Sequence, residues 1–415
     1  MIEKLCGLLV AVVSLCNVPV LGALQEGVLE TNYGEDIEFL ARELESRHKD
    51  LFGFQSREEW RRKIDGLLKN ITKLTEREIQ FELQKLVASI GDAHTSLQGK
   101  TDWLSYYPLN CKWFDDAITV TVADQKLANA LGARLVSVNG VPIETVIDNL
   151  RPFFSHDNEY GFRQLIEKQW NCAELMAYAC DFESVSPATF VFEKDGREFS
   201  IEVEAVPVGE VRNIQWQVAS QSPPRYVQKS RLAFWNDWIA ETKTVYFKYN
   251  RCEDHAGFDQ LVAGTKGFIE ANDVECFVLD LRDNGGGNSA IFASLFNYLS
   301  KNDQLNRPGH LYAIVGRGTF SSGMFAAYDM KKLNCVVVGE PTGGKPNHFG
   351  EVKSFELPNT RYQCYYSTKF WQFLKDSDPE SLEPDIRVEY NAADFLNGRD
   401  PAMDAIDADR QKRAK

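Results

Sequence analysis

The apolar positions between residues 34 and 87 follow a helical spacing. Apolar side chains recur three or four residues apart, with charged residues between them, in two runs: Ile37, Leu40, Leu44 and then Ile79, Leu83, Leu86. A periodic apolar stripe is typical of amphipathic helices that bury one face. The sequence therefore predicts a small helical unit near the start of the chain.

The pattern changes after Gly91, where runs of aromatic and β-branched residues begin and continue to about Val208. Such runs favour β-strands. Asn139 and Gly140 stand between two short apolar segments, and this pair favours a two-residue hairpin turn. We therefore expect a β-rich middle region, followed by a boundary at the Pro- and Ser-rich stretch 220–224.

Beyond residue 240, short apolar runs alternate with helical patterns. The expected order is a strand at 244–249, a helix at 258–271, a strand at 276–281, a helix at 290–299, a strand at 311–315, a helix at 323–332 and a strand at 335–338. This alternation indicates an α/β fold. Such folds bind ligands at the carboxyl ends of their strands, so we expect the functional site there.

The first 23 residues differ from the rest of the chain. Lys4 precedes an almost uncharged apolar run at 5–21, and the small residues Gly22 and Ala23 follow. This layout is typical of a secretory signal peptide, with a retained membrane anchor as the alternative. We therefore expect a secreted or periplasmic protein that has no stable membrane insertion once this segment is removed.

Charge and cysteine content narrow the possible functions. The 46 Lys and Arg and 60 Asp and Glu residues give a net charge of −14. This balance argues against a nucleic-acid partner, because phosphate binding needs a basic surface. No Cys/His spacing is typical of a zinc site, and we expect no metal or cofactor. Cys276 and Cys335 lie in apolar runs and are expected to be core thiols, while five others are candidates for disulfides: Cys111, Cys172, Cys180, Cys252 and Cys364.

A chain of 415 residues exceeds what one hydrophobic core normally organises. The patterns above divide it into five parts: a signal peptide at 1–23, a helical N-terminal domain at 24–100, a β-rich middle region at 101–210, an α/β core at 211–400 and a C-terminal tail at 401–415.

Three motifs follow expected strands of the α/β core. Asp280 to Ser289 runs from an apolar strand into three glycines, which let backbone N–H groups point to a common centre. Gly316 to Ala327 presents two serines where a strand turns into a helix. A serine on such a turn is exposed, and the next N–H group can bind an oxyanion. The third motif, Gly339 to His348, is a glycine-rich loop that carries Lys345 and His348.

Together and in this order, the motifs resemble the tail-specific, or C-terminal-processing, serine protease family, which includes the tricorn core protease and the interphotoreceptor retinoid-binding modules. The resemblance covers about residues 35–395 and is loose at 110–210, where only 132–143 is PDZ-like. The matched segments are Asp280 to Gly287, Ser322-Gly323, Gly339 to Lys345 and, more weakly, Gly91 to Thr95 and Ser381 to Ile386.

The resemblance implies an α/β, crotonase/ClpP-like ββα spiral core and hydrolysis of peptide bonds through a serine acyl-enzyme. It assigns the nucleophile to Ser322, with Ser321 as its neighbour. The oxyanion N–H groups would come from Gly323 and from Gly286 or Gly287.

The family uses two kinds of general base, and both have a candidate here. The lysine branch matches Lys345, which would have to be neutral and therefore desolvated. The histidine branch is similar around His94, and histidine needs no large pKa shift to act near pH 7. We favour His94, oriented by an acid that is most plausibly Asp378, with Asp376 and Glu380 as substitutes.

Two functions of different kinds follow from this resemblance. The first is a secreted serine-type peptidase that acts on unstructured or C-terminal segments of a polypeptide substrate. The second is a non-catalytic relative that binds an apolar ligand or a peptide on the same fold, because a fold does not fix a function. The presence of Ser322, His94, Lys345 and the glycine loops together favours the enzyme.

Overall fold

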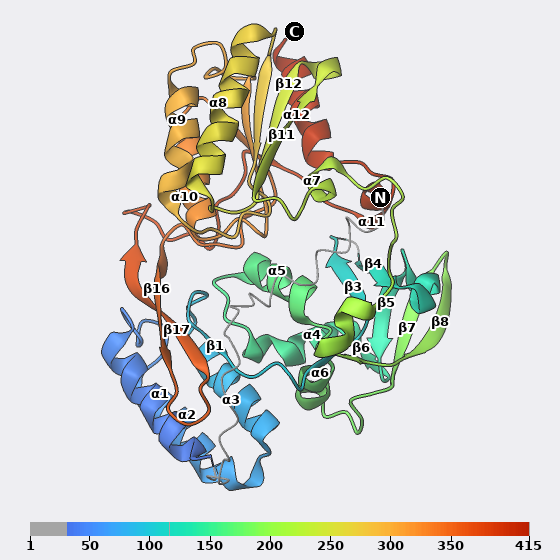
Figure 1. The fold of residues 1–415 in the computed structure, drawn as a ribbon, viewed down its shortest axis with the longest axis vertical. Coiled ribbons are helices and arrows are strands. Elements are labelled where there is room, and N and C mark those ends of the chain that lie inside the picture. The colour runs from blue at the N-terminus through green and yellow to red at the C-terminus, as the bar shows by residue number, and fades with distance from the viewer. Residues whose placement is uncertain (1–30, 116, 415) are drawn as a thin grey trace, which may run out of the picture.

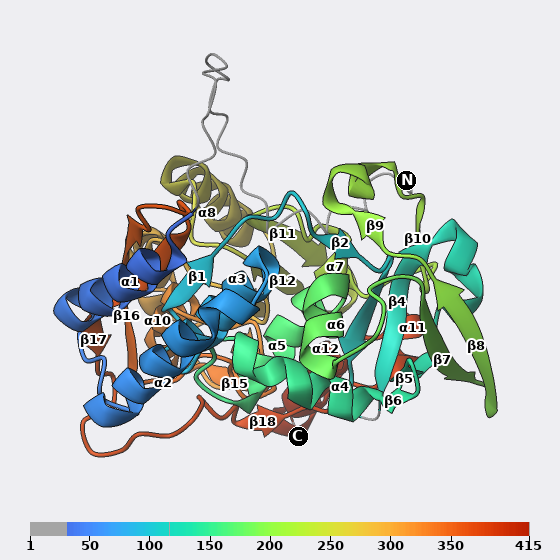
Figure 2. The same ribbon diagram turned by 90° about the horizontal axis from the view of Figure 1, so that it is seen from below.

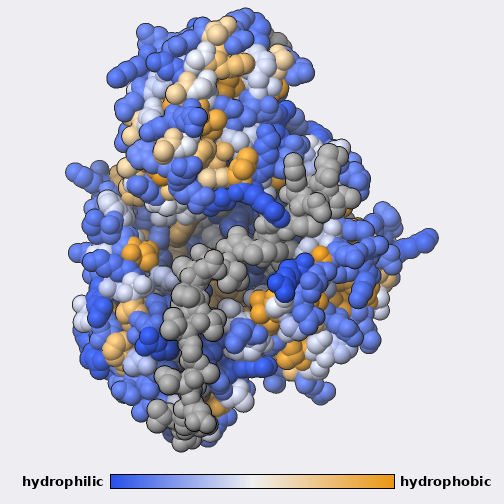
Figure 3. Space-filling view, in the orientation of Figure 1, coloured by the Kyte–Doolittle hydropathy of each residue, from blue (hydrophilic) through white to orange (hydrophobic). Residues whose placement is uncertain are grey.

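The computed structural model describes residues 31–115 and 117–414. The predicted signal peptide at 1–23 lies outside these residues. None of the helices within the described ranges is long and apolar enough to cross a membrane. The face drawn in Figure 3 is mostly hydrophilic, with apolar residues scattered over it.

The N-terminal helices form where the sequence predicts them. Their bounds are α1 Tyr33–Arg47, α2 Arg57–Asn70, η3 Ile71–Lys73 and α3 Glu76–Ala88. Asn32, Ser56 and Thr75 cap the three α-helices by accepting a backbone N–H, and Thr75 forms a reciprocal capping box with Glu78. These caps fix where each helix begins.

A distant hairpin completes the core of this helical region. Strands β16 (His348–Glu356) and β17 (Gln363–Trp371) run from the α/β core to the helices, and β1 (Ser96–Gln98) pairs with β17 (Figure 1). Buried side chains of the hairpin pack with those of α1, α2 and α3: Phe355, Leu357, Tyr362, Cys364 and Tyr366. The helical region therefore depends on residues more than 250 positions away for its core.

The middle region combines a twisted antiparallel sheet with helices (Figure 2). Its strands are β2 Ser105–Tyr106, β3 Leu109–Trp113, β4 Ile118–Asp124, β5 Arg134–Val138, β6 Val141–Pro142, β7 Ala188–Lys194, β8 Arg197–Val203, β9 Val206–Pro207 and β10 Trp216–Val218. Its helices are η4 Gln125–Ala130, α4 Ile143–Leu150, η5 Arg151–Phe153, α5 Glu159–Gln169, α6 Ala173–Cys180 and η6 Val208–Asn213.

Two local predictions for this region have different outcomes. The Asn139-Gly140 turn is confirmed, because both residues have positive φ and join the paired strands β5 and β6. The region predicted to be β-rich also contains α4, α5 and α6, which the sequence pattern did not predict. In α4 the buried residues Ile143, Val146 and Ile147 are β-branched, and packing against the sheet overrides their local strand preference.

The α/β core has one mixed sheet in the order β11-β12-β13-β14-β15-β18, parallel except for β11. The strands are β11 Phe234–Ile239, β12 Thr244–Tyr249, β13 Cys276–Asp280, β14 Leu311–Val315, β15 Val336–Gly339 and β18 Ile386–Arg387. The helices are α7 Arg225–Gln228, η7 Ala240–Thr242, α8 His255–Ala271, η8 Ser289–Phe292, α9 Ala293–Ser300, α10 Ser322–Lys331, α11 Ala392–Leu396 and α12 Pro401–Arg413. Apolar clusters cover both faces of this sheet.

The C-terminal residues differ from the prediction of a tail at 401–415. They form α12, which buries Ala402 and Ile406 against one face of the sheet. Most of its other residues are polar, so the sequence pattern concealed the helix. Asp400, just before α12, forms a two-pronged ion pair with Arg282, at 2.9 and 2.8 Å. The end of the chain therefore supports the first glycine motif.

The seven cysteines within the described residues are free thiols. The five disulfide candidates therefore form no bridge in this structure. Cys276, in β13, is fully buried in the apolar cluster on one face of the sheet, as expected of a core thiol, and Cys335 is partly buried.

Candidate active site

The second motif forms a strained turn between β14 and α10. Ser321 has φ 50° and ψ −125°, a conformation that residues with a side chain rarely adopt. Although Ser321 occupies the N-cap position, its side chain makes no capping hydrogen bond. No described residue hydrogen-bonds its Oγ. A strained strand-to-helix turn that presents a free serine hydroxyl is the geometry of a nucleophile elbow.

Ser322, the predicted nucleophile, lies in a different environment. Its side chain is buried, and its Oγ donates a hydrogen bond to the carbonyl oxygen of Gly287 at 2.6 Å. This bond ties the start of α10 to the glycine loop. The backbone N–H of Ser322 has no acceptor among the described residues. The local geometry therefore favours Ser321 as the attacking group, with Ser322 supplying a tether and a free N–H.

The backbone N–H groups around the turn are not equally available. Gly323 donates its N–H to the carbonyl of Phe320 at 2.9 Å, and Gly286 donates to Asn284 Oδ1 at 2.9 Å. These two predicted oxyanion donors are therefore occupied by the fold itself. Gly287, the third, has no acceptor for its N–H within the described part of the chain. Ser322 and Gly287 are thus the pair of open donors.

The glycine loop lies directly against the serine turn. A β-carbon on Gly286 would come within 2.6 Å of the Ser321 β-carbon and 3.0 Å of the Ser322 nitrogen. Gly286 and Gly287 have φ of 103° and 127°, which side chains disfavour. At Gly287 a β-carbon would also meet the Cys252 carbonyl oxygen at 2.3 Å. Only glycine fits at both positions, which explains this part of the motif.

His94 reaches the serine turn from the N-terminal region. It follows α3, and its ring stacks on Phe320 with centroids 4.3 Å apart and on His348 at 5.5 Å. Phe320 is the residue before Ser321, so the predicted base and the hydroxyl belong to one site. Neither ring nitrogen of His94 has a hydrogen-bond partner in the described residues, and both are buried.

Burial of His94 lowers its pKa to about 4, and nearby His348 adds to this effect, while Asp92 opposes it. The ring is therefore neutral at pH 7 and able to accept a proton. A neutral imidazole is the form that a general base requires. The pKa of His94 therefore lies below the ordinary histidine value of about 6.5.

The acid beside His94 is not Asp378. Asp92 Oδ1 lies 3.9 Å from His94 Nδ1, and its carboxylate is buried. Burial raises the pKa of Asp92, but hydrogen bonds from His48, Ser367, Thr95 and the His94 backbone N–H outweigh this effect and lower it. Asp92 is therefore an ionised acid next to the ring. It stands inside the Gly91 to Thr95 match, so the motif contained it although the sequence analysis did not assign it a role.

Lys345 pairs with the two acids that were expected to serve the histidine. Its Nζ lies 3.5 Å from Asp378 Oδ2 and 3.2 Å from Glu380 Oε1. Burial lowers the pKa of Lys345, but hydrogen bonds and charge attraction from Glu380 and Asp378 raise it more. Lys345 is therefore a charged ammonium here, which does not suit a general base. Asp376, the other substitute acid, makes no interaction with His94.

Buried ion pairs brace the first glycine motif. Arg282 is buried and pairs with Asp280 as well as Asp400. Buried Lys248 joins Asp280 to Asp283 at 3.1 and 2.6 Å. These ion pairs hold the strand end from which the glycines begin. Glu340, within the third motif, pairs with Arg317 at 2.6 Å.

Comparison with known proteins places the fold. No protein-family model matches the sequence, and no curated protein does. Mature CPAF complexed with lactacystin matches with a TM-score of 0.65 over 92% of this chain and 98% of that chain, at 12% identity. Mature CPAF alone matches with a TM-score of 0.61, over 92% and 96%, also at 12% identity. A photosystem II D1 C-terminal processing protease matches at 0.43, over 90% and 99%, at 12% identity.

At this level of identity the likeness concerns the fold. The chain has the mixed α/β architecture predicted from its resemblance to the tail-specific proteases, and it shares its fold with the two CPAF structures. The resemblance stated from the motifs is confirmed to this extent.

Proposed function

We propose that this chain is a serine peptidase that hydrolyses peptide bonds of unstructured or C-terminal polypeptide segments through an acyl-enzyme. The observation that carries the proposal is the strained Ser321 turn with its free hydroxyl, together with the open N–H groups of Ser322 and Gly287 and a neutral His94 that stacks on the preceding Phe320. We further propose a secreted or periplasmic location, as the N-terminal 23 residues predict.

In this mechanism the Ser321 Oγ attacks the substrate carbonyl while His94 accepts the hydroxyl proton. The N–H groups of Ser322 and Gly287 bind the oxygen that becomes negative, a kind of contact worth about 10²–10³-fold in rate. His94 then gives its proton to the leaving amine. A water molecule attacks the acyl-enzyme, again with His94 as base, and releases the acid. The sequence-based assignment differs in two respects: it places the attacking hydroxyl on Ser322, and it takes the oxyanion donors from Gly323 and from Gly286 or Gly287.

Paired alanine variants test this assignment. We expect Ser321→Ala to lose at least about 10³-fold in hydrolysis of an unstructured polypeptide, because it removes the nucleophile. Ser322→Ala should retain measurable activity, reduced by loosening of the Gly287 tether. Both variants should keep their stability within about 2 kcal/mol, as expected for the loss of one hydroxyl group. An inactive Ser322→Ala beside an active Ser321→Ala would show that Ser322 is the nucleophile.

A fluorophosphonate probe separates the peptidase from the non-catalytic alternative. We expect a single adduct on Ser321, located by mass spectrometry of the intact and digested protein. The folded protein failing to label on any serine, together with absent hydrolysis, would favour a ligand-binding relative instead.

A further inference from the structure

One short segment of the middle region touches both loops that frame the candidate site. Residues 155–161 include the connection from η5 to α5 and the first residues of α5. Ser155 Oγ donates to the carbonyl of Thr95 at 2.6 Å, and the Ala93 N–H donates to Asp157 Oδ1 at 3.1 Å. These bonds hold the residues on both sides of His94.

The same segment also holds the third motif. Asn158 Nδ2 donates to the carbonyl of Thr342 at 3.1 Å and to that of Glu380 at 2.5 Å. A β-carbon on Gly161 would lie 2.6 Å from the Gly343 carbonyl oxygen, so the two backbones are in close contact. The loop that carries Lys345 and His348 is thereby fixed to the middle region.

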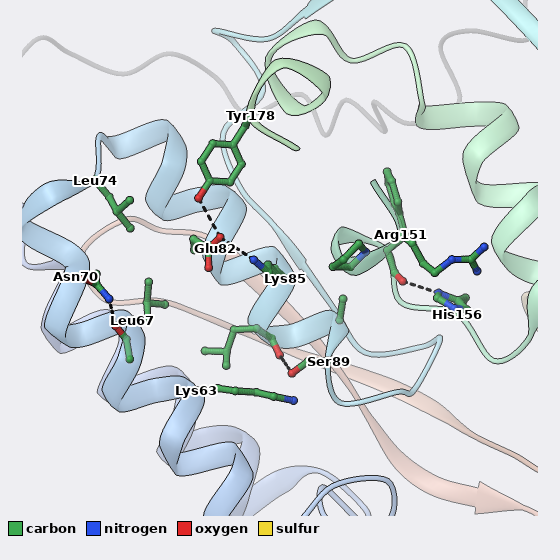
Figure 4. A pocket seen from close by; sticks show the side chains of 15 residues that line it. Lys63, Leu67, Asn70, Leu74, Glu82, Lys85, Ser89, Arg151, His156 and Tyr178 are labelled. Carbon is green, nitrogen blue, oxygen red and sulfur yellow. Dashed lines mark hydrogen bonds and ion pairs between the residues drawn. The ribbon is translucent and has the colours of Figure 1, made fainter. Parts of the chain in front are cut away.

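Alternate side chains of the segment face opposite sides. His156, and Phe154 just before the segment, line a cavity of about 730 Å³ between the middle region and helices α2 and α3 (Figure 4). Ser155 and Asp157 bond to the histidine turn instead. The segment therefore separates that cavity from the candidate site. Its Ser155 and Asp157 side chains make polar contacts with the histidine turn of the site.

Asp157 has an unusual carboxyl group. Oδ2 is buried and makes no well-formed hydrogen bond to a described residue, although Oδ1 accepts from Ala93. Burial raises its pKa to about 7, Asp92 adds to this effect, and the Ala93 and Lys345 backbones and the Lys345 charge oppose it. Burying a carboxyl group with one oxygen unpaired costs free energy, and carboxyl groups with shifted pKa values are concentrated at functional sites.

We propose that residues 155–161 form a clamp and that Asp157 is the positioning residue that sets the histidine turn against the Lys345 loop. The inference rests on the proposed peptidase function, because it concerns the alignment of His94 with the serine turn. Asp157 acts through the Ala93 N–H and does not touch the reacting atoms.

The test compares Asp157→Ala with Asp157→Asn in the full chain, with Asp148→Asn, at an exposed position of α4, as a charge-matched control. We expect Asp157→Ala to lower kcat about 10–100-fold with KM within about twofold, as for other residues that orient a functional group. Asp157→Asn should recover most of kcat, because its amide oxygen can accept the Ala93 N–H. Asp148→Asn should match the wild type.

The pH profile gives a readout that a merely structural role would not change. In the wild type, ionisation of Asp157 strengthens the bond from Ala93, so kcat/KM should rise through about pH 7. Asp157→Asn should lose this rise. An Asn variant as inactive as Ala, or one that keeps the rise, would overturn the positioning role, as would an Ala variant within twofold of the wild type.

Amide hydrogen exchange tests the clamp independently of whether the protein hydrolyses a substrate. Exchange at residues 93–95 should accelerate at least tenfold in Asp157→Ala and, if that variant does not fold, in Ser155→Ala. Unchanged exchange overturns the clamp. Wild-type protein with no hydrolysis and no probe adduct would contradict the proposed function, while the exchange result would still decide the clamp.

Discussion

The Ser321 turn and the His94 turn are both parts of the candidate site, but they are held by different interactions. The serine turn is fixed by neighbours in the same α/β core, through the Gly286 contact and the Ser322 to Gly287 hydrogen bond. The histidine turn is held by packing on Phe320 and His348 and by the clamp residues of the middle region. The α/β core alone therefore positions the candidate nucleophile, whereas His94 is positioned by contacts with both the α/β core and the middle region.

This difference explains their electrostatics. The serine turn leaves a hydroxyl and two N–H groups open, as a site for a substrate carbonyl needs. The histidine turn is buried, and both its ring nitrogens lack partners among the described residues. Burial without a hydrogen bond makes the charged imidazole unfavourable, which is why its pKa falls.

Removing the histidine should have the larger effect on activity. We expect His94→Ala to lose about 10²–10⁴-fold in kcat/KM, the usual contribution of a general base. In the wild type, the rise of kcat/KM with pH that reports on His94 should lie near pH 4, because a base must be deprotonated and burial lowers the pKa of His94 to about 4. His255→Ala, an exposed histidine on α8, is the matched control and should be unaffected. Full activity of His94→Ala would show that His94 is not the general base.

Crowding the serine turn should have the next largest effect. We expect Gly286→Ala to reduce kcat about 10²-fold or more, because its β-carbon would press on Ser321 at 2.6 Å and displace the turn. Gly285→Ala is the matched control, since a β-carbon there has open space and no positive φ. Steady-state kinetics on both variants measures this difference. Equal activity of the two would show that the glycine contact does not set the turn.

The smallest effect is expected at Lys345. Its pKa is raised by Glu380 and Asp378 despite partial burial, so it is protonated and cannot act as the base. Lys345→Ala should keep activity within about tenfold, and its stability should change by no more than about 1 kcal/mol, because both partner acids are exposed to solvent and such ion pairs are weak. Kinetics and thermal unfolding measure both. An inactive Lys345→Ala beside an active His94→Ala would reverse the assignment of the base.

Local sequence signals predicted the α/β core well. The strand at 244–249 coincides with β12, and the helix expected at 323–332 is α10, displaced by one residue. These elements have regular apolar spacing, and parallel strands buried on both faces need continuous apolar runs. Helices α4, α5 and α6 of the middle region were missed, because their apolar residues are packed by a sheet that the local pattern does not reveal.

The motifs indicated the segments that form the candidate site but not which side chain in each segment has which role. Ser321, Ser322, Gly287 and His94 all lie where the motifs predicted chemistry. The choice between adjacent serines depends on φ at Ser321 and on which hydroxyl the Gly287 carbonyl binds. The orienting acid was sought near Asp378, whereas Asp92, two residues from His94, is the nearer carboxylate. Backbone geometry and ion pairing of this kind have no signature in residue order.

The sequence by itself determined the class of fold, the glycine positions that permit the loop, and the two segments that carry serine and histidine, because apolar periodicity and glycine requirements are local. The tertiary structure decided which N–H groups remain open, which carboxylate meets His94 and which acids neutralise Lys345. It also decided that residues 155–161 hold both loops of the site. These features depend on contacts between residues tens to hundreds of positions apart, and burial at those contacts sets the charge states.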